Sequence, residues 1–247
     1  MCIRDRVNAG LKPHDSYEAF VKILLEKGVG SSSVITFNYD MGLDVAIHFA
    51  GHDINYGLNP SKNRGIRVLK LHGSINWART PPSEDGSSRI VPYTMDAFDV
   101  DFRQPPYGPR RLPFSNFLKI LSTPNQEVIH EFPVIVPPTW NKTEYHGSIT
   151  NVWSAAANDL STARNIYIFG YSLPETDSFF RYLYALGTMG DTRIRRFWVF
   201  DPDSSGLIRN RYEKLLGAGI SNRFKYFEEP FSKALKKMRE ELKLGTS

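Results

Sequence analysis

Residues 68–77 are Val-Leu-Lys-Leu-His-Gly-Ser-Ile-Asn-Trp, an apolar run that stops at a histidine followed by a glycine. The apolar residues Val68, Leu69 and Leu71 predict a covered strand, and Gly73 permits a sharp bend directly after the histidine. Ligands of open parallel sheets bind beyond the carboxyl ends of the strands, so this strand would deliver His72 to a binding crevice. The alternative is a histidine that merely ends a strand.

A second strand is expected over residues 33–37, and it too ends in polar side chains, Asn38 and Asp40. A helix follows it, and the next expected strand is the one that ends at His72. Two successive strand–helix units would therefore direct Asn38, Asp40 and His72 into the same crevice. Asp40 has an alternative role, as the N-cap of the helix that begins at Met41.

Length and composition favour a globular protein. The 247 residues are 41% hydrophobic and 13% aromatic, which suits one large α/β domain or one domain with an insertion. The chain has no apolar run near the ~18 residues that a membrane span requires, and its start lacks the apolar core of a signal peptide. A single cysteine cannot form an intrachain disulfide. We therefore expect a cytoplasmic protein without a membrane partner.

The net charge of +5 is mild and favours anionic ligands, dinucleotides included. Basic residues are scattered except near the C-terminus, where they alternate with apolar residues at helical spacing. This pattern predicts an amphipathic terminal helix with a solvated basic face, and we do not expect nucleic acid as a partner. The alternative is a DNA-binding or membrane-binding face. The basic residues are Lys233, Lys236, Lys237, Arg239 and Lys243, and the apolar ones are Leu235, Met238, Leu242 and Leu244.

The stretch 80–131 differs in character from the rest, because prolines and glycines are interleaved with charges over much of it. We expect an irregular inserted subdomain that lies over the crevice as a lid, or alternatively a surface excursion without function. Strand character returns over residues 132–136. Trp140, in a Pro-Pro-Thr-Trp turn, is either a stacking platform or a core residue.

The last third shows the clearest alternation of strands and helices. A helix is expected over about residues 143–163 and a strand over residues 165–169, which ends at Gly170, Tyr171 and Ser172. Another helix follows from Pro174. Backbone amides at that helix start, with a glycine for close approach and a serine hydroxyl, would suit a phosphate or a ribose.

A further strand over residues 196–200 ends in Asp201. This carboxylate either accepts both hydroxyls of a ribose or caps the helix expected from Ser204 onward. Residues 224–227 are expected to form an edge strand before the final helix. The repeated alternation predicts an α/β fold, with a doubly wound, mostly parallel, Rossmann-like sheet and an irregular insertion.

Three short motifs, in this order, resemble the SIR2-like domains, which are relatives of the sirtuins. They are Thr-Phe-Asn-Tyr-Asp at 36–40, Leu-His-Gly-Ser at 71–74 and Phe-Gly-Tyr-Ser-Leu-Pro at 169–174. The resemblance covers roughly residues 33–203. It is strongest to the prokaryotic SIR2-like group that is associated with NAD hydrolysis in antiphage (antiviral) defence, in which Pro-Pro-x-Trp turns also occur.

The resemblance implies a role for each matching residue. Asn38 and Asp40 match the residues that line the nicotinamide-ribose pocket, and His72 matches the catalytic histidine. Gly170 and Ser172, which flank Tyr171, match residues that contact the phosphate and ribose portion of the dinucleotide. NAD would then be the substrate, and the activity implied is an NAD+ hydrolase, or NADase, that releases nicotinamide and ADP-ribose.

Two departures from the family pattern carry expectations of their own. Sirtuin deacylases have a four-cysteine zinc module, whereas Cys2 is the single cysteine here, so we expect no zinc and no deacetylase activity. The family also begins with a strand and a Gly-Ala-Gly turn, which nothing before Ser33 reproduces. We therefore expect one SIR2-like domain over 1–247 that lacks its N-terminal glycine-turn unit, with enzyme activity in a full-length parent.

Three classes of function remain open at this point. The first is the NAD hydrolase, the second is a module that senses NAD or an ADP-ribose-like signal without turnover, and the third is an interaction or nucleic-acid module based on the basic C-terminus. Fused or associated effector or sensor domains and a homo-oligomer are compatible with the sequence. A ribose contact by Asp201 would favour NAD over NADP, because a carboxylate repels an added phosphate.

Overall fold

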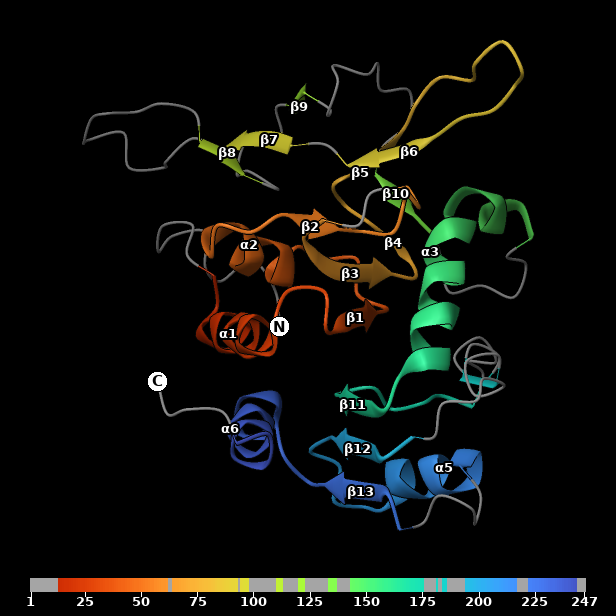
Figure 1. Cartoon of the computed structure of the whole chain (residues 1–247). Coiled ribbons are helices and arrows are strands. Elements are labelled where there is room, and N and C mark those ends of the chain that lie inside the picture. Colours follow the sequence, from red (N-terminus) through yellow and green to blue (C-terminus); the bar gives the residue numbers. More distant parts are fainter. Residues whose placement is uncertain are drawn as a thin grey trace. The chain divides into compact units, whose positions relative to one another are not determined.

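A computed structural model of the chain describes residues 13–61, 64–92, 94–97, 110–112, 120–122, 133–136, 143–175, 181, 184–185, 194–216 and 222–243 (Figure 1). The chain divides into two units, Met1–Trp153 and Ser154–Ser247. Each unit contains a three-stranded parallel sheet. With the helices described below, this confirms the expected α/β, Rossmann-like class.

The parallel sheet of the first unit consists of β1 (Ser33–Thr36), β3 (Ile66–Lys70) and β2 (Ile54–Asn55), in the order β1-β3-β2. Thr36 of β1 pairs with Lys70 of β3, so the two strands end side by side. The apolar side chains of β3 are buried, as expected of a central strand, and Leu71 beyond its end is buried as well. The carboxyl ends of β1 and β3 therefore share one edge.

Two helices of the first unit, α1 (Asp15–Lys27) and α2 (Gly42–Phe49), contact each other. In α1 the buried residues follow helical spacing, the pattern that buries one face of a helix, whereas in α2 residues 43–47 are all buried. The buried residues are Phe20, Val21, Ile23 and Leu24 on α1 and Leu43, Val45, Ala46 and Ile47 on α2. Asp44 is buried among the apolar residues of α2, so a carboxylate lies inside the first unit.

The chain after β3 differs from the expected second strand–helix unit. The short strand β4 (Gly73–Ser74) pairs antiparallel with β10 (Val134–Ile135), and β5 (Trp77–Arg79) pairs antiparallel with β6 (Ile90–Pro92). Gly73 has φ +78°, and a Cβ at this position would clash with the Val134 carbonyl oxygen. The glycine thus allows the bend after His72 and the close approach of β10.

Part of the expected insertion over 80–131 is regular in structure. β7 (Thr94–Ala97), β8 (Arg110–Leu112) and β9 (Ile120–Ser122) form an antiparallel sheet in the order β8-β7-β9. Residues 93, 98–109, 113–119 and 123–131 lie outside the described residues, as does Trp140. The lid role of this stretch stays a prediction.

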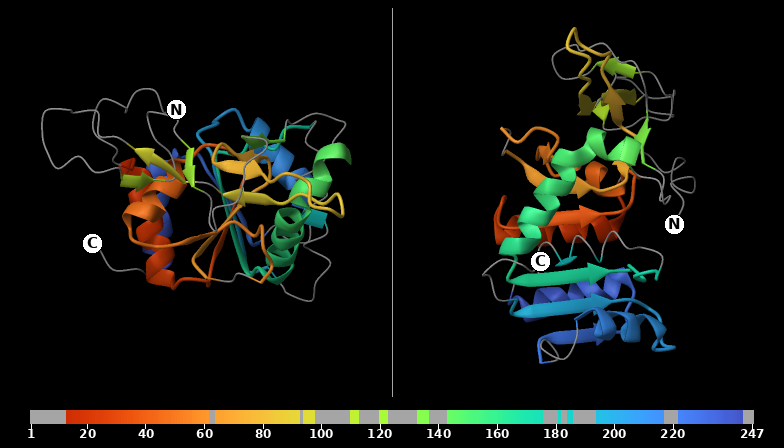
Figure 2. Two further views of the ribbon diagram at one scale, coloured as in Figure 1. Left: turned by 90° about the horizontal axis from the view of Figure 1, so that it is seen from above. Right: turned by 90° about the vertical axis from the view of Figure 1, so that its right-hand side faces the viewer.

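The second unit contains a parallel sheet in the order β11-β12-β13, and the right-hand view of Figure 2 shows its strands side by side in teal to blue. The strands are β11 (Asn165–Phe169), β12 (Arg196–Phe200) and β13 (Phe224–Phe227), so the predicted edge strand is confirmed. Helix α3 (Thr143–Thr162) precedes β11. The helix expected from Pro174 lies mostly outside the described residues.

Two further helices, α5 (Leu207–Leu216) and α6 (Phe231–Glu241), belong to the second unit. Ala234, Leu235 and Met238 are buried, which confirms the amphipathic C-terminal helix. The basic face is not wholly solvated, because Lys237 Nζ lies 4.3 Å from the centre of the Phe227 ring. Among the described residues, none of the helices combines the length and apolar content that crossing a bilayer would require.

Substituting Gly73 is expected to destabilise the fold. Gly73→Ala should lower the free energy of unfolding by about 2–5 kcal/mol, from the left-handed backbone and from the overpacking against Val134. Gly86→Ala is the matched control, because Gly86 has φ +77° but open space around it, and it should cost only about 1–2 kcal/mol. Urea unfolding measures the free energy of unfolding of both variants. Equal losses of stability in Gly73→Ala and Gly86→Ala would contradict the close approach of β10.

Candidate functional site

The loops that follow β1 and β3 are joined by backbone hydrogen bonds. The Leu71 amide donates to the Thr36 carbonyl at 2.9 Å, and the Ile75 amide donates to the Tyr39 carbonyl at 3.1 Å. The sequence-predicted residues Asn38 and Asp40 lie on the first loop, and His72 lies on the second, as expected of the carboxyl ends of neighbouring parallel strands.

The individual environments of these three residues differ. His72 is half-buried, and the centre of its ring lies 5.4 Å from that of Phe37. Asn38 is exposed, with its backbone amide bonded to Thr36 Oγ1 at 3.0 Å. Asp40 Oδ1 accepts from the Gly42 amide at 2.8 Å. The helix begins at Gly42 with Met41 as its N-cap, so the expected N-cap role of Asp40 for a helix from Met41 is wrong by one residue. Its charge still contributes to the potential at this edge of the sheet.

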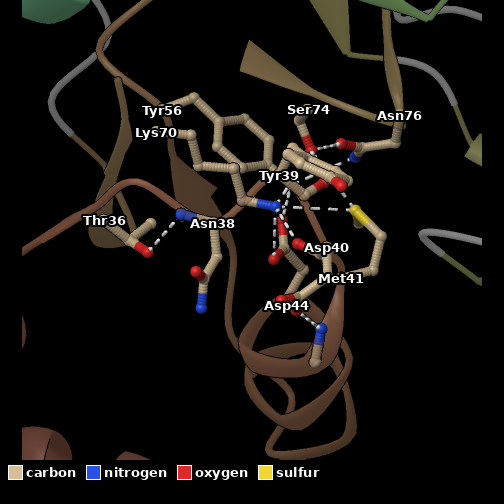
Figure 3. A network of polar contacts seen from close by, with 11 residues as sticks. Thr36, Asn38, Tyr39, Asp40, Met41, Asp44, Tyr56, Lys70, Ser74 and Asn76 are labelled. Carbon is tan, nitrogen blue, oxygen red and sulfur yellow. Dashed lines mark hydrogen bonds and ion pairs between the residues drawn. The ribbon is translucent and has the colours of Figure 1, made fainter. Parts of the chain in front are cut away.

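A buried ion pair lies beneath the two loops. Lys70 Nζ is 2.8 Å from Asp44 Oδ2, and the two side chains are 1% and 0% exposed. The same ammonium group donates to the Asp40 carbonyl at 2.6 Å and to Ser74 Oγ at 2.9 Å. Figure 3 shows Lys70 Nζ at the centre of these contacts. The ammonium group thus combines the ion pair with Asp44 and hydrogen bonds to the Asp40 carbonyl and to Ser74 Oγ.

The contacts of Lys70 continue into a closed cycle of hydrogen bonds. Ser74 Oγ donates to Asn76 Oδ1 at 2.7 Å, Asn76 Nδ2 donates to the Tyr56 hydroxyl at 3.1 Å, and Tyr56 donates to Asp44 Oδ1 at 2.5 Å. Burial, followed by the Asp44 charge, raises the pKa of Tyr56 well above its usual value, which keeps the hydroxyl a donor. We call Lys70, Ser74, Asn76, Tyr56 and Asp44 the buried ring.

Sequence reasoning missed the buried ring. It used the apolar neighbours of Lys70 to predict the strand and gave no role to Lys70 itself, nor to Asp44 within the apolar α2 segment. The available signal was a charged residue inside each of two apolar segments, because lysine and aspartate are almost never fully buried unless they are paired. Neither segment, however, identifies the other as its partner.

In the second unit, side chains from α5 hold the loop that follows β11. The Tyr212 hydroxyl donates to the Tyr171 carbonyl at 2.7 Å, and an Arg211 Nη donates to the Ser172 carbonyl at 3.1 Å. The Gly170 amide donates to the Phe200 carbonyl at 2.9 Å, and Gly170 has φ +61°. The predicted NAD-binding residues Gly170, Tyr171 and Ser172 thus lie on a loop with a fixed backbone.

Asp201 lies directly after β12 and is buried, with its Oδ1 accepting from the Asp203 amide at 3.0 Å. The start of α5 is capped by Asp203 rather than by Asp201, because Asp203 Oδ2 accepts from the Ile208 amide at 3.2 Å. Hydrogen bonds from Ser205 and Ile208 lower the pKa of Asp203. The ribose-binding role of Asp201 stays a prediction.

No three His, Cys, Asp or Glu side chains in the described part of the chain lie close enough together to hold a metal ion. The four-cysteine zinc module of the sirtuin deacylases is already excluded by the single cysteine of the chain. Other ways of binding zinc are untested, so the expectation of no zinc stays a prediction.

Breaking the Lys70–Asp44 pair is expected to be costly. Lys70→Met or Asp44→Asn alone should lower the free energy of unfolding by about 3–5 kcal/mol, because each leaves one buried charge uncompensated. The control is Arg209→Met, which breaks an ion pair whose side chains are 57% and 45% exposed and should cost less than about 1 kcal/mol. Denaturant unfolding measures these free energies. Similar losses of stability at the buried pair and at the exposed pair would contradict the buried charge pair.

Stability should also depend on Tyr17 at high pH. Burial, with Asp40 and Asp44 as smaller causes, raises the pKa of Tyr17 to about 12. The Tyr17 hydroxyl therefore loses its proton at lower pH in the unfolded chain than in the folded chain. Its contribution to the free energy of unfolding is complete below pH ~10 and is lost as the pH rises to ~12. We expect the wild-type stability to fall relative to that of Tyr17→Phe across this window. A constant difference between the two unfolding free energies would contradict this assignment.

No protein-family model matches the chain, and no curated protein matches it. Solved structures of Sir2 proteins are similar to it in fold. A Sir2 homologue mutant in complex with ADP-ribose is 14% identical with a TM-score of 0.46, and the match covers 98% of this chain and 72% of that chain. A complex described as Sir2, p53 peptide and NAD+ is 14% identical with a TM-score of 0.41, covering 95% and 72%. Such low values describe a distant likeness, which transfers neither activity nor ligands.

Proposed function

We propose that this chain carries the catalytic residues of an NAD+ hydrolase, which cleaves the nicotinamide–ribose bond to give nicotinamide and ADP-ribose. The observation that carries the proposal is the pairing of the Asn38–Asp40 loop with the His72 loop at the carboxyl ends of β1 and β3. The ordered motifs that resemble SIR2-like domains supply the substrate class. From the same resemblance we propose a role in prokaryotic antiphage defence.

The chemistry needs few groups. The ribose carbon passes through an oxocarbenium-like state as its bond to nicotinamide breaks, and the electron pair of that bond neutralises the pyridinium. Because nicotinamide leaves as a neutral molecule, no acid is required. Water forms the new bond to the ribose carbon, and His72 takes the proton that this water loses. We assign Asn38 to orient the water or the ribose, and Asp40 to stabilise positive charge nearby.

The hydrogen bond from the Gly42 amide to Asp40 is compatible with this assignment, because electrostatic stabilisation requires the charge of the carboxylate and not a direct contact. We further propose that Gly170, Tyr171, Ser172 and Asp201 contact the phosphate and ribose portion of NAD. The hydrogen bonds from Tyr212 and Arg211 support this, because they fix the loop backbone before any ligand binds. The 80–131 stretch would serve as a lid.

The second candidate is a module that binds NAD or ADP-ribose without turnover. The engagement of the Asp40 carboxylate at the start of α2 favours it, since this residue then has a structural role that explains its presence. The two candidates differ in product formation alone. Calorimetric binding of NAD+ without release of nicotinamide would support the sensor.

Nicotinamide release tests the hydrolase. The chain, and any longer native protein that contains it, is incubated with NAD+, and the product is measured by chromatography. We expect His72→Ala and Asn38→Ala to lower the rate at least about 10²-fold, which is the usual contribution of a positioned base. His48→Ala, at an exposed position of α2, is the matched control and should retain activity. Equal turnover in all variants would exclude the proposed roles.

A further inference from the structure

We propose that the buried ring is a positioning device, in which Lys70 fixes the Asn38–Asp40 loop against the His72 loop. Its consequence for catalysis rests on the proposed NAD hydrolysis, whereas its consequence for loop geometry does not. In this assignment Lys70 is a positioning residue, because it is 1% exposed and its ammonium group already contacts Asp44, the Asp40 carbonyl and Ser74. It is not placed to exchange a proton with substrate.

The contacts of the ammonium group join three segments of the chain. Asp44 belongs to α2, the Asp40 carbonyl belongs to the loop after β1, and Ser74 belongs to β4, two residues after His72. Met41 Sδ lies 3.6 Å from the same nitrogen. A single charge therefore binds both candidate catalytic loops and the helix that follows the first one (Figure 3). The two charged side chains are 1% and 0% exposed, so the pair is shielded from solvent, where electrostatic contacts are stronger than in water.

The middle of the loop after β1 is held mainly by polar contacts. Asn38 is exposed and Tyr39 is 52% exposed, so these two residues bury little apolar surface, whereas Met41 at the end of the loop is fully buried. Lys70 binds the Asp40 carbonyl, the Ile75 amide binds the Tyr39 carbonyl, and the Asn38 amide bonds to Thr36 Oγ1. Loss of the ammonium group would remove one of these contacts and loosen the position of Asn38 relative to His72.

Stability alone does not account for a charged ring at this place. A buried ion pair is commonly no more stabilising than well-packed neutral residues of similar size, and it is costly only when one partner is removed. A neutral pair can therefore preserve the fold, but a methionine in place of Lys70 cannot donate to the Asp40 carbonyl. This difference separates a positioning role from a purely structural one.

The test is the double variant Asp44→Asn/Lys70→Met, compared with the wild type and with both single variants. It carries no buried charge and keeps an acceptor for Tyr56. We expect a thermal midpoint well above those of the single variants. We also expect kcat for nicotinamide release to fall at least about tenfold and KM to change by less than about threefold, because the misplacement affects the transition state. The exposed pair variant Arg209→Met/Glu213→Gln is the control and should change none of these values.

Amide hydrogen exchange provides a readout that is independent of NAD. In the double variant, exchange at residues 37–41 and at the Ile75 amide should become faster, while α6 remains unchanged. Restored stability with wild-type kcat and wild-type exchange would overturn the inference. If the wild type itself releases no nicotinamide, the proposed hydrolase fails, and exchange alone then decides the positioning role.

A second variant covers the case in which the double variant does not fold. Ser74→Ala keeps the Lys70–Asp44 pair but removes the oxygen that connects Lys70 to β4 and to Asn76. We expect faster exchange at the Ile75 amide and a lower kcat, each by a smaller factor than in the double variant. Exchange and kcat at wild-type values in Ser74→Ala would contradict the role of the ring.

Discussion

The first unit depends on one buried interaction, the 2.8 Å contact between Lys70 and Asp44. A lysine and an aspartate removed from water must be fully paired, and here Ser74, Asn76 and Tyr56 complete the pairing through a closed cycle of hydrogen bonds. Because Lys70 is the last residue of β3, the same pair fixes where that strand ends. The loops that carry His72 and Asn38 begin at this point.

The two units hold the loops that carry the predicted site residues in a similar way. In the first unit, Lys70 donates to the Asp40 carbonyl. In the second unit, Tyr212 and Arg211 donate to the carbonyls of Tyr171 and Ser172. In each case a side chain from a neighbouring element fixes a backbone carbonyl of the loop. Backbone groups fixed before binding lose less conformational freedom when a substrate binds, which suits both catalysis and tight recognition.

Much of the fold follows from local patterns, and the site only in part. The apolar runs predicted β3, β11 and β12, and the glycine directly after His72 predicted the bend at Gly73. β2 contains two residues, too few for a periodic pattern, and β4 depends on its pairing with the distant β10. The buried ring was missed because Lys70 and Asp44 interact through tertiary structure, which no pattern in either segment encodes.

We propose above all that the nicotinamide ribose of NAD binds between the loops of Asn38 and His72. The most direct measurement is a crystal structure of the His72→Ala variant with NAD+, in which slow turnover would preserve the substrate. We expect the nicotinamide ribose within hydrogen-bonding distance of Asn38, beside the substituted position. NAD+ bound elsewhere on the chain, or a structure that excludes it from these loops at saturating concentration, would contradict the claim.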